Sequence, residues 1–161
     1  MQEKPTTRII SVVEIRRSIG EVFAFGSTPR TWPTWHPTAT SVSGAVDRPI
    51  QEGDRILEQD RFSFLVGCIH WKVSRVVSPS TWTIEGLVDE VPIFRGTTTT
   101  ITYTLKPIPG GTRLERDMTY SAPSTLARFL DWLHFRGHNT RQSQRAVDQM
   151  KQLLESPSGA G

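Results

Sequence analysis

Residues 123–155 read PSTLARFLDWLHFRGHNTRQSQRAVDQMKQLLE, and this stretch decides how the rest of the chain is interpreted. It is predicted to form one amphipathic helix. Taken at steps of three and four, one face of that helix is apolar at both ends and polar in the middle. That face carries Leu126, Phe129, Leu130, Leu133, Arg136 or Gly137, Thr140, Ser143 or Gln144, Val147, Met150 and Leu154.

The polar middle of this face has two explanations. It can face a solvated or ligand-filled cavity rather than dry core. Alternatively, the helix can end at Gly137 and begin again with Asn139 as its N-cap. The two explanations are compatible, because a kink can open a cavity.

Working outward from the helix, the preceding chain is rich in strand-like segments. TRIISVVEIR at residues 7–16 is the first, and FRGTTTTITYTL at 94–105 is the clearest. Two short helices should follow the first strand: Ser18 and Glu21 match a capping box, and Pro29 suits the first position of a helix that carries Trp32 and Trp35. The remaining predicted strands are residues 38–46, 55–64, 67–77, 81–88 and 112–120.

This order of elements predicts an α+β fold in which a curved antiparallel sheet wraps around the single long helix. A sheet that curls around one helix seldom closes completely, so an apolar hole tends to remain between the two. The sequence therefore predicts a protein that holds a small, largely apolar molecule.

Composition fits one ordinary domain of 161 residues, with a formal net charge of +3. A single cysteine, Cys68, excludes an internal disulfide and a cysteine metal site. No secretion signal or membrane span is recognised, so a cytoplasmic protein is expected. Residues 124–151 carry five cations and two anions, which can attract nucleic acid, anionic lipid or an acidic ligand, or can simply form a solvated face. No nucleic-acid partner is expected.

Several short motifs occur in a characteristic order. They are VVEIRRSIGEVFAF at 12–25, WPTWHP at 32–37, GDR at 53–55, YTLKP at 103–107, GGTRL at 110–114 and MKQLLE at 150–155. Together they resemble the START-like superfamily, also called SRPBCC or the polyketide cyclase/dehydrase and lipid transport group. The resemblance covers residues 8–155 of a single domain, 1–161, and the tail 156–161 is expected to be flexible.

This resemblance implies a helix-grip fold, with a seven-stranded antiparallel sheet holding the long helix across its concave face. Members of the superfamily include lipid carriers, plant hormone receptors, and aromatases and cyclases that act on polyketides. The matching motifs are mainly structural in that group, so they carry no catalytic residue over to this chain.

Strand parity nominates the residues that face the cavity. If Tyr103 points inward, then Ile101, Thr99, Thr97 and Arg95 do so too, and an inward Leu114 implies inward Arg116, Met118 and Tyr120. A buried arginine is costly without a carboxylate partner. Arg95 or Arg116 could therefore hold a ligand oxygen, pair with Glu58, Asp60 or Asp117, or point outward in a shifted register.

The candidate ligand-binding residues combine these strand positions with aromatic and helix positions. They are Trp35, Trp71, Arg95, Ile101, Tyr103, Arg116, Met118, Tyr120, Leu133 and Thr140. Tyr103 and Tyr120 are candidate enolate stabilisers, although packing alone would also explain them. His36 can face the cavity mouth or pack at a helix end.

No metal and no cofactor are expected. His134 and His138 have the spacing of two metal ligands on a helix, but no third ligand is evident.

Three classes of function are retained. The first is a carrier or binding protein for a small hydrophobic or aromatic molecule. The second is a cyclase, aromatase or dehydratase that uses acid/base groups in the same cavity. The third is an interaction protein that uses the basic C-terminal helix.

Overall fold

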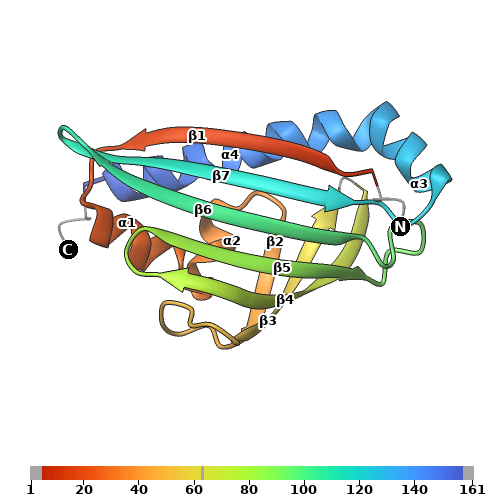
Figure 1. Cartoon of the computed structure of the whole chain (residues 1–161), viewed down its shortest axis with the longest axis horizontal. Helices are drawn as coiled ribbons and strands as arrows, with labels where there is room; N and C mark the ends of the chain where they lie inside the picture. Colours follow the sequence, from red (N-terminus) through yellow and green to blue (C-terminus); the bar gives the residue numbers. More distant parts are fainter. Residues whose placement is uncertain (1–4, 63, 158–161) are drawn as a thin grey trace.

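The structure is a computed structural model that describes residues 5–62 and 64–157. Seven strands form one antiparallel sheet in the order β1-β7-β6-β5-β4-β3-β2. The strands are β1 (Thr7–Ile15), β2 (Ala39–Gly44), β3 (Arg55–Phe62), β4 (Leu65–Val77), β5 (Thr81–Asp89), β6 (Thr98–Ile108) and β7 (Gly111–Ser121). The predicted helix-grip architecture is confirmed: the long C-terminal helix runs along the sheet behind β1 and β7 (Figure 1).

Two short helical elements follow β1, as the sequence predicts. In α1 (Ile19–Gly26), the Glu21 carboxylate accepts from the Ser18 backbone N–H at 3.0 Å, and the Ser18 hydroxyl accepts from the Glu21 N–H, which completes the capping box. The 3₁₀ turn η1 (Pro29–Thr31) leads directly into α2 (Trp32–Trp35). Both tryptophans of α2 are buried, so this segment contributes large side chains to the core.

The C-terminal helix is continuous but irregular. It comprises α3 (Thr125–Leu130), a π-helical turn η2 (Asp131–Phe135) and α4 (Arg136–Glu155). The alternative of a break at Gly137 is wrong, because the helix continues through that residue. The irregularity lies one turn earlier, where wider π-type hydrogen bonding changes which side chains face the sheet.

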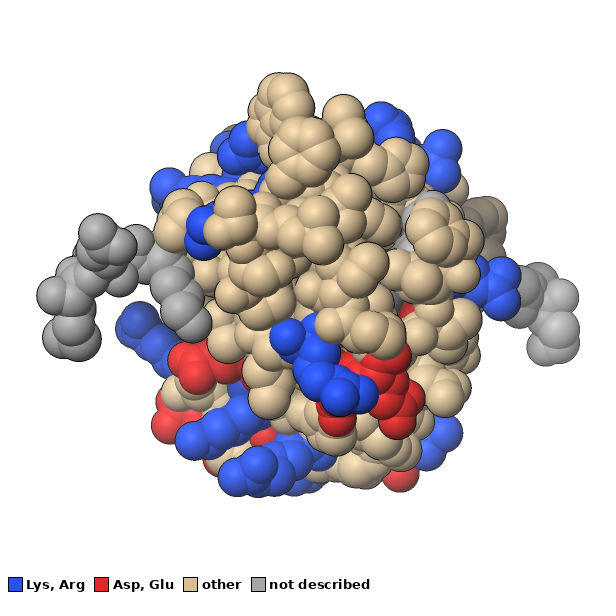
Figure 2. All heavy atoms as spheres, turned by 90° about the vertical axis from the view of Figure 1, so that its right-hand side faces the viewer, with Lys and Arg blue, Asp and Glu red and all other residues tan. Residues whose placement is uncertain are grey.

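Because of the π-helical turn, the first part of the helix buries a different set of side chains from the one that the sequence predicts. Ala127, Asp131 and Phe135 are buried instead, at intervals of four residues. The predicted inward residues Leu126 and Leu133 are each 62% exposed. Phe129 and Trp132 are also exposed. Seen from the side of α3, uncharged side chains cover the upper and central part of the molecule's face, while Lys, Arg, Asp and Glu gather in its lower part and further Lys and Arg lie along the upper edges (Figure 2).

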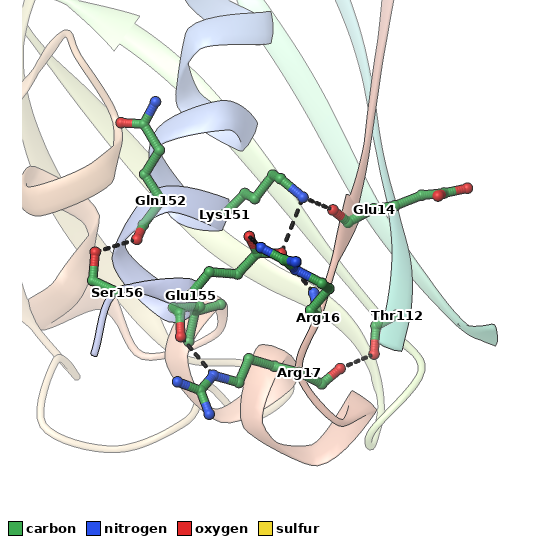
Figure 3. A network of polar contacts seen from close by, with 9 residues as sticks. Glu14, Arg16, Arg17, Thr112, Lys151, Gln152, Glu155 and Ser156 are labelled. Atoms are coloured by element: carbon green, nitrogen blue, oxygen red, sulfur yellow. Dashed lines mark hydrogen bonds and ion pairs between the residues drawn. The ribbon is translucent and has the colours of Figure 1, made fainter. Parts of the chain in front are cut away.

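The C-terminal end of α4 is hydrogen-bonded to the end of β1 and to the residues that join β1 to α1 (Figure 3). The Glu155 carboxylate accepts from the Arg16 backbone N–H at 2.7 Å and from Lys151 Nζ at 3.0 Å. Lys151 Nζ also donates to the Glu14 carbonyl at 2.6 Å, and Arg17 Nε donates to the Leu154 carbonyl at 2.6 Å. The bonds from Arg16 and Lys151 to the Glu155 carboxylate lower its pKa to about 2, with the Arg16 backbone bond as the largest cause. They hold the helix across the open face of the sheet.

None of the helices in the described ranges is long and apolar enough to cross a membrane.

Candidate functional site

A cavity lies between the concave face of the sheet and the C-terminal helix. About 130 Å³ of it is open to the centre of a water molecule. Much of its wall is apolar, and these lining residues are Trp32, Trp35, Ile69, Trp71, Ile84, Val88, Val91, Phe94, Ile101, Met118, Ala122 and Phe135. The predicted combination of a curved sheet, a long helix and an unfilled space between them is therefore present.

One glycine shapes the sheet side of the cavity. A Cβ at Gly86 would come within 2.6 Å of the Trp71 ring and 2.8 Å of the Ile69 side chain. Gly86 on β5 is paired with Trp71 on β4, so the absent side chain leaves the room that the indole occupies. The glycine thus lets a large ring lie flat against the sheet and form part of the cavity wall.

Arg116 is the most unusual residue in the cavity. It comes from β7, lines the space and is 2% exposed. Its Nε donates to the Tyr103 hydroxyl at 3.0 Å, and its Nη1 donates to Ser143 Oγ at 2.7 Å. Within residues 5–62 and 64–157, no carboxylate forms an ion pair with it. A buried guanidinium is therefore held by neutral oxygens, which leaves its charge to be balanced at longer range.

His36 contacts Arg116 from the end of α2, and its chemistry follows from that contact. Arg116 Nη2 lies 3.5 Å from His36 Nε2, and because a guanidinium can only donate, Nε2 must be the acceptor. The proton then sits on Nδ1, which donates to Thr38 Oγ1 at 2.9 Å. Burial, and secondly the Arg116 charge, lower the pKa of His36 to about 3. The imidazole is therefore neutral at pH 7.

Two carboxyl groups on β3 face the same cavity. Glu58 is 5% exposed and Asp60 is 3% exposed, and both line the space. Residues two apart on a strand point to the same side, which brings the two groups together. Burial raises the pKa of both: Asp60 to about 6, and Glu58 well above its usual range, with repulsion from Asp60 as the second cause for Glu58. The charge of Arg116 opposes both shifts without cancelling them.

A second polar region lies farther along β6 and β7. The Tyr120 hydroxyl donates to Asp131 Oδ1 at 2.6 Å, and Thr7 Oγ1 donates to Asp131 Oδ2 at 3.3 Å. Arg116 and Tyr120 are four residues apart on one strand, or roughly 13 Å. Between them lies Met118, paired with Ile101. The cavity thus has two polar regions with an apolar level between them.

Several buried polar atoms in the cavity lack a hydrogen-bond partner among the described residues. Those that belong to lining residues are Asp60 Oδ1, Trp71 Nε1, Thr97 Oγ1, Thr99 Oγ1 and Gln142 Oε1. Buried polar groups are normally paired, so a set of unpaired ones around a cavity is a feature of sites that bind polar atoms of a ligand or water.

The structure places most of the sequence-predicted residues on the cavity wall. Trp35, Trp71, Ile101, Tyr103, Arg116, Met118, Tyr120 and His36 line it. Three positions were predicted wrongly. Arg95 lies in the loop before β6, where its side chain is 66% exposed and pairs with Asp89 at 3.2 Å. Leu133 is exposed because the π-helical turn rotates it outward, and Thr140 is exposed with its hydroxyl bonded to the Arg136 carbonyl.

The helix contributes other residues in their place. Asn139, Gln142 and Ser143 line the cavity, so the polar middle of the helix does face it. The sequence places Ser143 on the predicted face, but it predicts Asn139 only as an N-cap. A repeat of four residues that starts at Ala127 reaches Asn139 and Ser143. That repeat can be recognised only when the π-helical turn is already known.

No group of three or more His, Cys, Asp or Glu side chains in the described ranges could hold a metal ion. His134 and His138 have no third ligand there.

Comparison with known proteins supports the same fold. A family model described as polyketide cyclase / dehydrase and lipid transport matches residues 6–155. A structure of protein MLL2253 from Mesorhizobium loti has a TM-score of 0.67 at 18% identity, covering 92% of this chain and 97% of that chain. Ms6760 from Mycobacterium smegmatis gives 0.67 at 17% identity, covering 95% and 99%.

A plant protein is also similar. The structure of major latex-like protein 151 from Panax ginseng has a TM-score of 0.65 at 9% identity, covering 94% of this chain and 99% of that chain. Identities this low show a common fold and nothing more specific. No curated protein gives a significant match.

Proposed function

Because this chain belongs to the polyketide cyclase / dehydrase and lipid transport family of the START-like superfamily, we propose that its cavity binds a small, largely apolar or aromatic molecule that carries an oxygen function. One observation carries the proposal. The cavity wall is largely apolar, yet Arg116 lies in it without a carboxylate ion pair among the described residues. A ligand oxygen beside Arg116 and Tyr103 would supply the missing acceptor, while the aromatic wall would cover the rest of the molecule.

The direct test is native mass spectrometry of the protein purified from its own host, with the co-purifying compound identified. A bound molecule with a ring system and an oxygen function is expected. A preparation that carries no compound, and that binds none of a panel of small aromatic ketones, phenols and acids, would contradict the proposal.

Replacing Arg116 by methionine should weaken binding of such a ligand by roughly tenfold to a hundredfold, because a hydrogen bond to a charged donor contributes about 1.5–3 kcal/mol. The neutral ketone 2-acetonaphthone is a suitable probe, and isothermal titration calorimetry measures its affinity. Arg95→Met is the matched control, since Arg95 lies outside the cavity on the loop before β6. If both variants bind the probe with equal affinity, Arg116 does not contribute to the binding site.

A second candidate function is enzymatic, and the convergence of acid/base groups favours it. Glu58, Asp60, Tyr103 and Arg116 all line one cavity. A carboxylate could take a proton from the carbon next to a ligand carbonyl. The electron pair of the broken C–H bond would then form a C=C bond, and the carbonyl π electrons would move to the oxygen and give an enolate. Tyr103 is suited to stabilise the enolate oxygen, because its oxygen accepts from Arg116 and its own O–H is left to donate. Cyclisation and dehydration of polyketide-like molecules both proceed through such enolates.

This second function can be tested without knowing the natural substrate. The protein should catalyse exchange of the methyl protons of 2-acetonaphthone with deuterium from the solvent, followed by NMR. Tyr103→Phe should slow the exchange by about a hundredfold or more. Tyr120→Phe should leave it nearly unchanged, because the Tyr120 hydroxyl already donates to Asp131. No exchange above the rate in buffer would argue against the enzymatic function and leave the binding function standing.

A further inference from the structure

The balance of charge inside the cavity carries information about the ligand. Of the three carboxyl groups that line the cavity, Glu58 and Asp60 lie in the same polar region as the cation Arg116, and these three residues are at most 5% exposed; the third carboxyl group, Asp131, lies in the second polar region with Tyr120. A net charge is expensive to bury, so the cavity is most stable when its charges sum to zero. With one fixed positive charge, that condition is met when one carboxyl group is ionised and the other keeps its proton.

The geometry around the two carboxyl groups agrees with a retained proton. They are two residues apart on β3 and therefore point the same way. Asp60 Oδ1 is buried and accepts no hydrogen bond from the described residues, although it lines the cavity. A carboxylate oxygen in such a place needs a donor, which can be the protonated neighbour or a ligand hydroxyl.

The other polar groups of the cavity cannot supply further compensation. His36 is kept neutral by its burial and, secondly, by the charge of Arg116, and the Tyr103 hydroxyl accepts from Arg116. Asp131 also lines the cavity, but it accepts from Tyr120 and Thr7 in the second polar region, which the apolar level of Met118 and Ile101 separates from Arg116. The charge at the polar wall is therefore decided by Arg116 and the two carboxyl groups of β3.

We propose that Glu58 and Asp60 form a carboxyl pair that shares one proton at neutral pH, and that this pair makes the cavity select an uncharged ketone or phenol over a carboxylate of the same shape. The inference rests on the proposed binding function and names the chemical class of its ligand. An uncharged ligand leaves the balance intact, and its oxygen can accept from Arg116, from Tyr103 or from the shared proton. A carboxylate adds a negative charge, so it must either bind weakly or take up a second proton with it.

The shared proton also gives the pair a possible role in turnover. The ionised member can accept a proton from a bound molecule, and the protonated member can return one to it. The number of protons in the cavity is then the same before and after the exchange.

The first arm of the test uses no ligand. Carbon-13 NMR of the side-chain carboxyl groups follows the titration of Glu58 and Asp60, with resonances assigned from Glu58→Gln and Asp60→Asn. One proton is expected to stay on the pair at pH 7. Two independent titrations, each complete below pH 6, would overturn the inference whether or not any ligand binds.

The second arm compares two probes with the same bicyclic ring. Isothermal titration calorimetry in buffers of different ionisation enthalpy measures the affinity and the protons taken up for 2-acetonaphthone and for 2-naphthoate. The ketone should bind without proton uptake. The naphthoate should bind at least about tenfold more weakly at pH 7, with uptake of a proton and with affinity that rises as the pH falls.

The double variant Glu58→Gln/Asp60→Asn provides the decisive comparison. It removes the single negative charge of the pair and leaves Arg116 unbalanced, so preference should reverse toward the naphthoate. Naphthoate binding to the parent protein as tightly as the ketone and without proton uptake would overturn the inference, as would an unchanged preference in a folded double variant. If that variant does not fold, Glu58→Gln alone should keep the preference for the ketone, because an ionised Asp60 still balances Arg116, and a reversed preference in this single variant would overturn the inference. If neither probe binds the parent protein, the proposed binding function fails for this ligand class, and the carboxyl titration still decides whether the pair shares a proton.

Discussion

Trp82→Ala is expected to lower the free energy of unfolding by about 3–5 kcal/mol, which is the usual cost of removing a large ring from a packed core. Trp82 on β5 is fully buried. Its ring stacks on Tyr103 at a centroid distance of 4.5 Å and meets Phe23 of α1 edge-on at 5.6 Å. The change therefore removes packing between the sheet and α1, and it also frees one face of the tyrosine ring in the cavity. Denaturant unfolding followed by circular dichroism measures the loss.

Trp132→Ala is the matched control. Trp132 lies in η2, at the start of the C-terminal helix, and is 67% exposed, so its removal should change stability by no more than about 0.5 kcal/mol. A Trp82→Ala protein as stable as the Trp132→Ala protein would contradict the packing between α1 and the sheet.

The fold could be predicted from the sequence because its signals are local and repeated. The capping box at Ser18, the proline at the start of the second helical segment and the threonine-rich strand β6 each act over a few residues. The predicted strands agree with the observed ones to within about four residues at their ends. Antiparallel neighbours then follow in chain order from β2 to β7, and β1 adds to the free edge of β7.

The predicted inward positions agree with the structure where one strand continues without interruption. From Tyr103 and Leu114, parity gave the inward positions Ile101, Arg116 and Tyr120. It failed for Arg95, because β6 begins at Thr98 and the preceding residues form a loop with Gly96 at φ +85°. Thr97 lies between Gly96 and the strand and still lines the cavity, so the alternation is lost at Gly96 and Arg95 does not inherit its direction from β6.

The carboxyl pair could not be found from the sequence with any certainty. Residues 55–61 read RILEQDR, with polar side chains on both faces of β3. The inward face holds Ile56, Glu58 and Asp60, but the outward face, with Leu57 and Gln59, is just as mixed in character. From the sequence alone, Glu58 and Asp60 are predicted only as partners of an arginine. Their shared environment depends on how strongly the sheet curves, which no local pattern encodes.

Asp60→Asn should make the protein more stable relative to the parent at pH 8 than at pH 4. The ordinary pKa of an aspartate is about 4, and burial raises that of Asp60 to about 6. The folded state thus binds the proton more tightly than the unfolded state. Its contribution to stability is complete below pH 4 and is lost as the pH rises through 6. The size of this loss is on the order of 3 kcal/mol, and asparagine, which cannot ionise, does not suffer it.

The measurement is the difference in the free energy of unfolding between variant and parent at each pH. His36, whose pKa is lowered to about 3, has the opposite pH dependence in both proteins, and its contribution cancels in that difference. Loss of repulsion from Asp60 also makes ionisation of Glu58 less costly, which changes the difference in the same direction. The sign of the expected effect therefore does not depend on how the two carboxyl groups divide their shared proton.

Asp54→Asn is a control of opposite sign. Hydrogen bonds from Arg48 lower the pKa of Asp54, so its contribution to stability is present at pH 7 and lost as the pH falls below 4. That variant should lose stability at pH 7 and approach the parent at low pH. A stability difference for Asp60→Asn that is flat between pH 4 and pH 8 would mean that Asp60 ionises as readily as an exposed aspartate. Because a buried carboxyl group that ionises normally must have a strong partner, such a result would place Asp60 in a direct ion pair with Arg116 and leave no shared proton in the cavity.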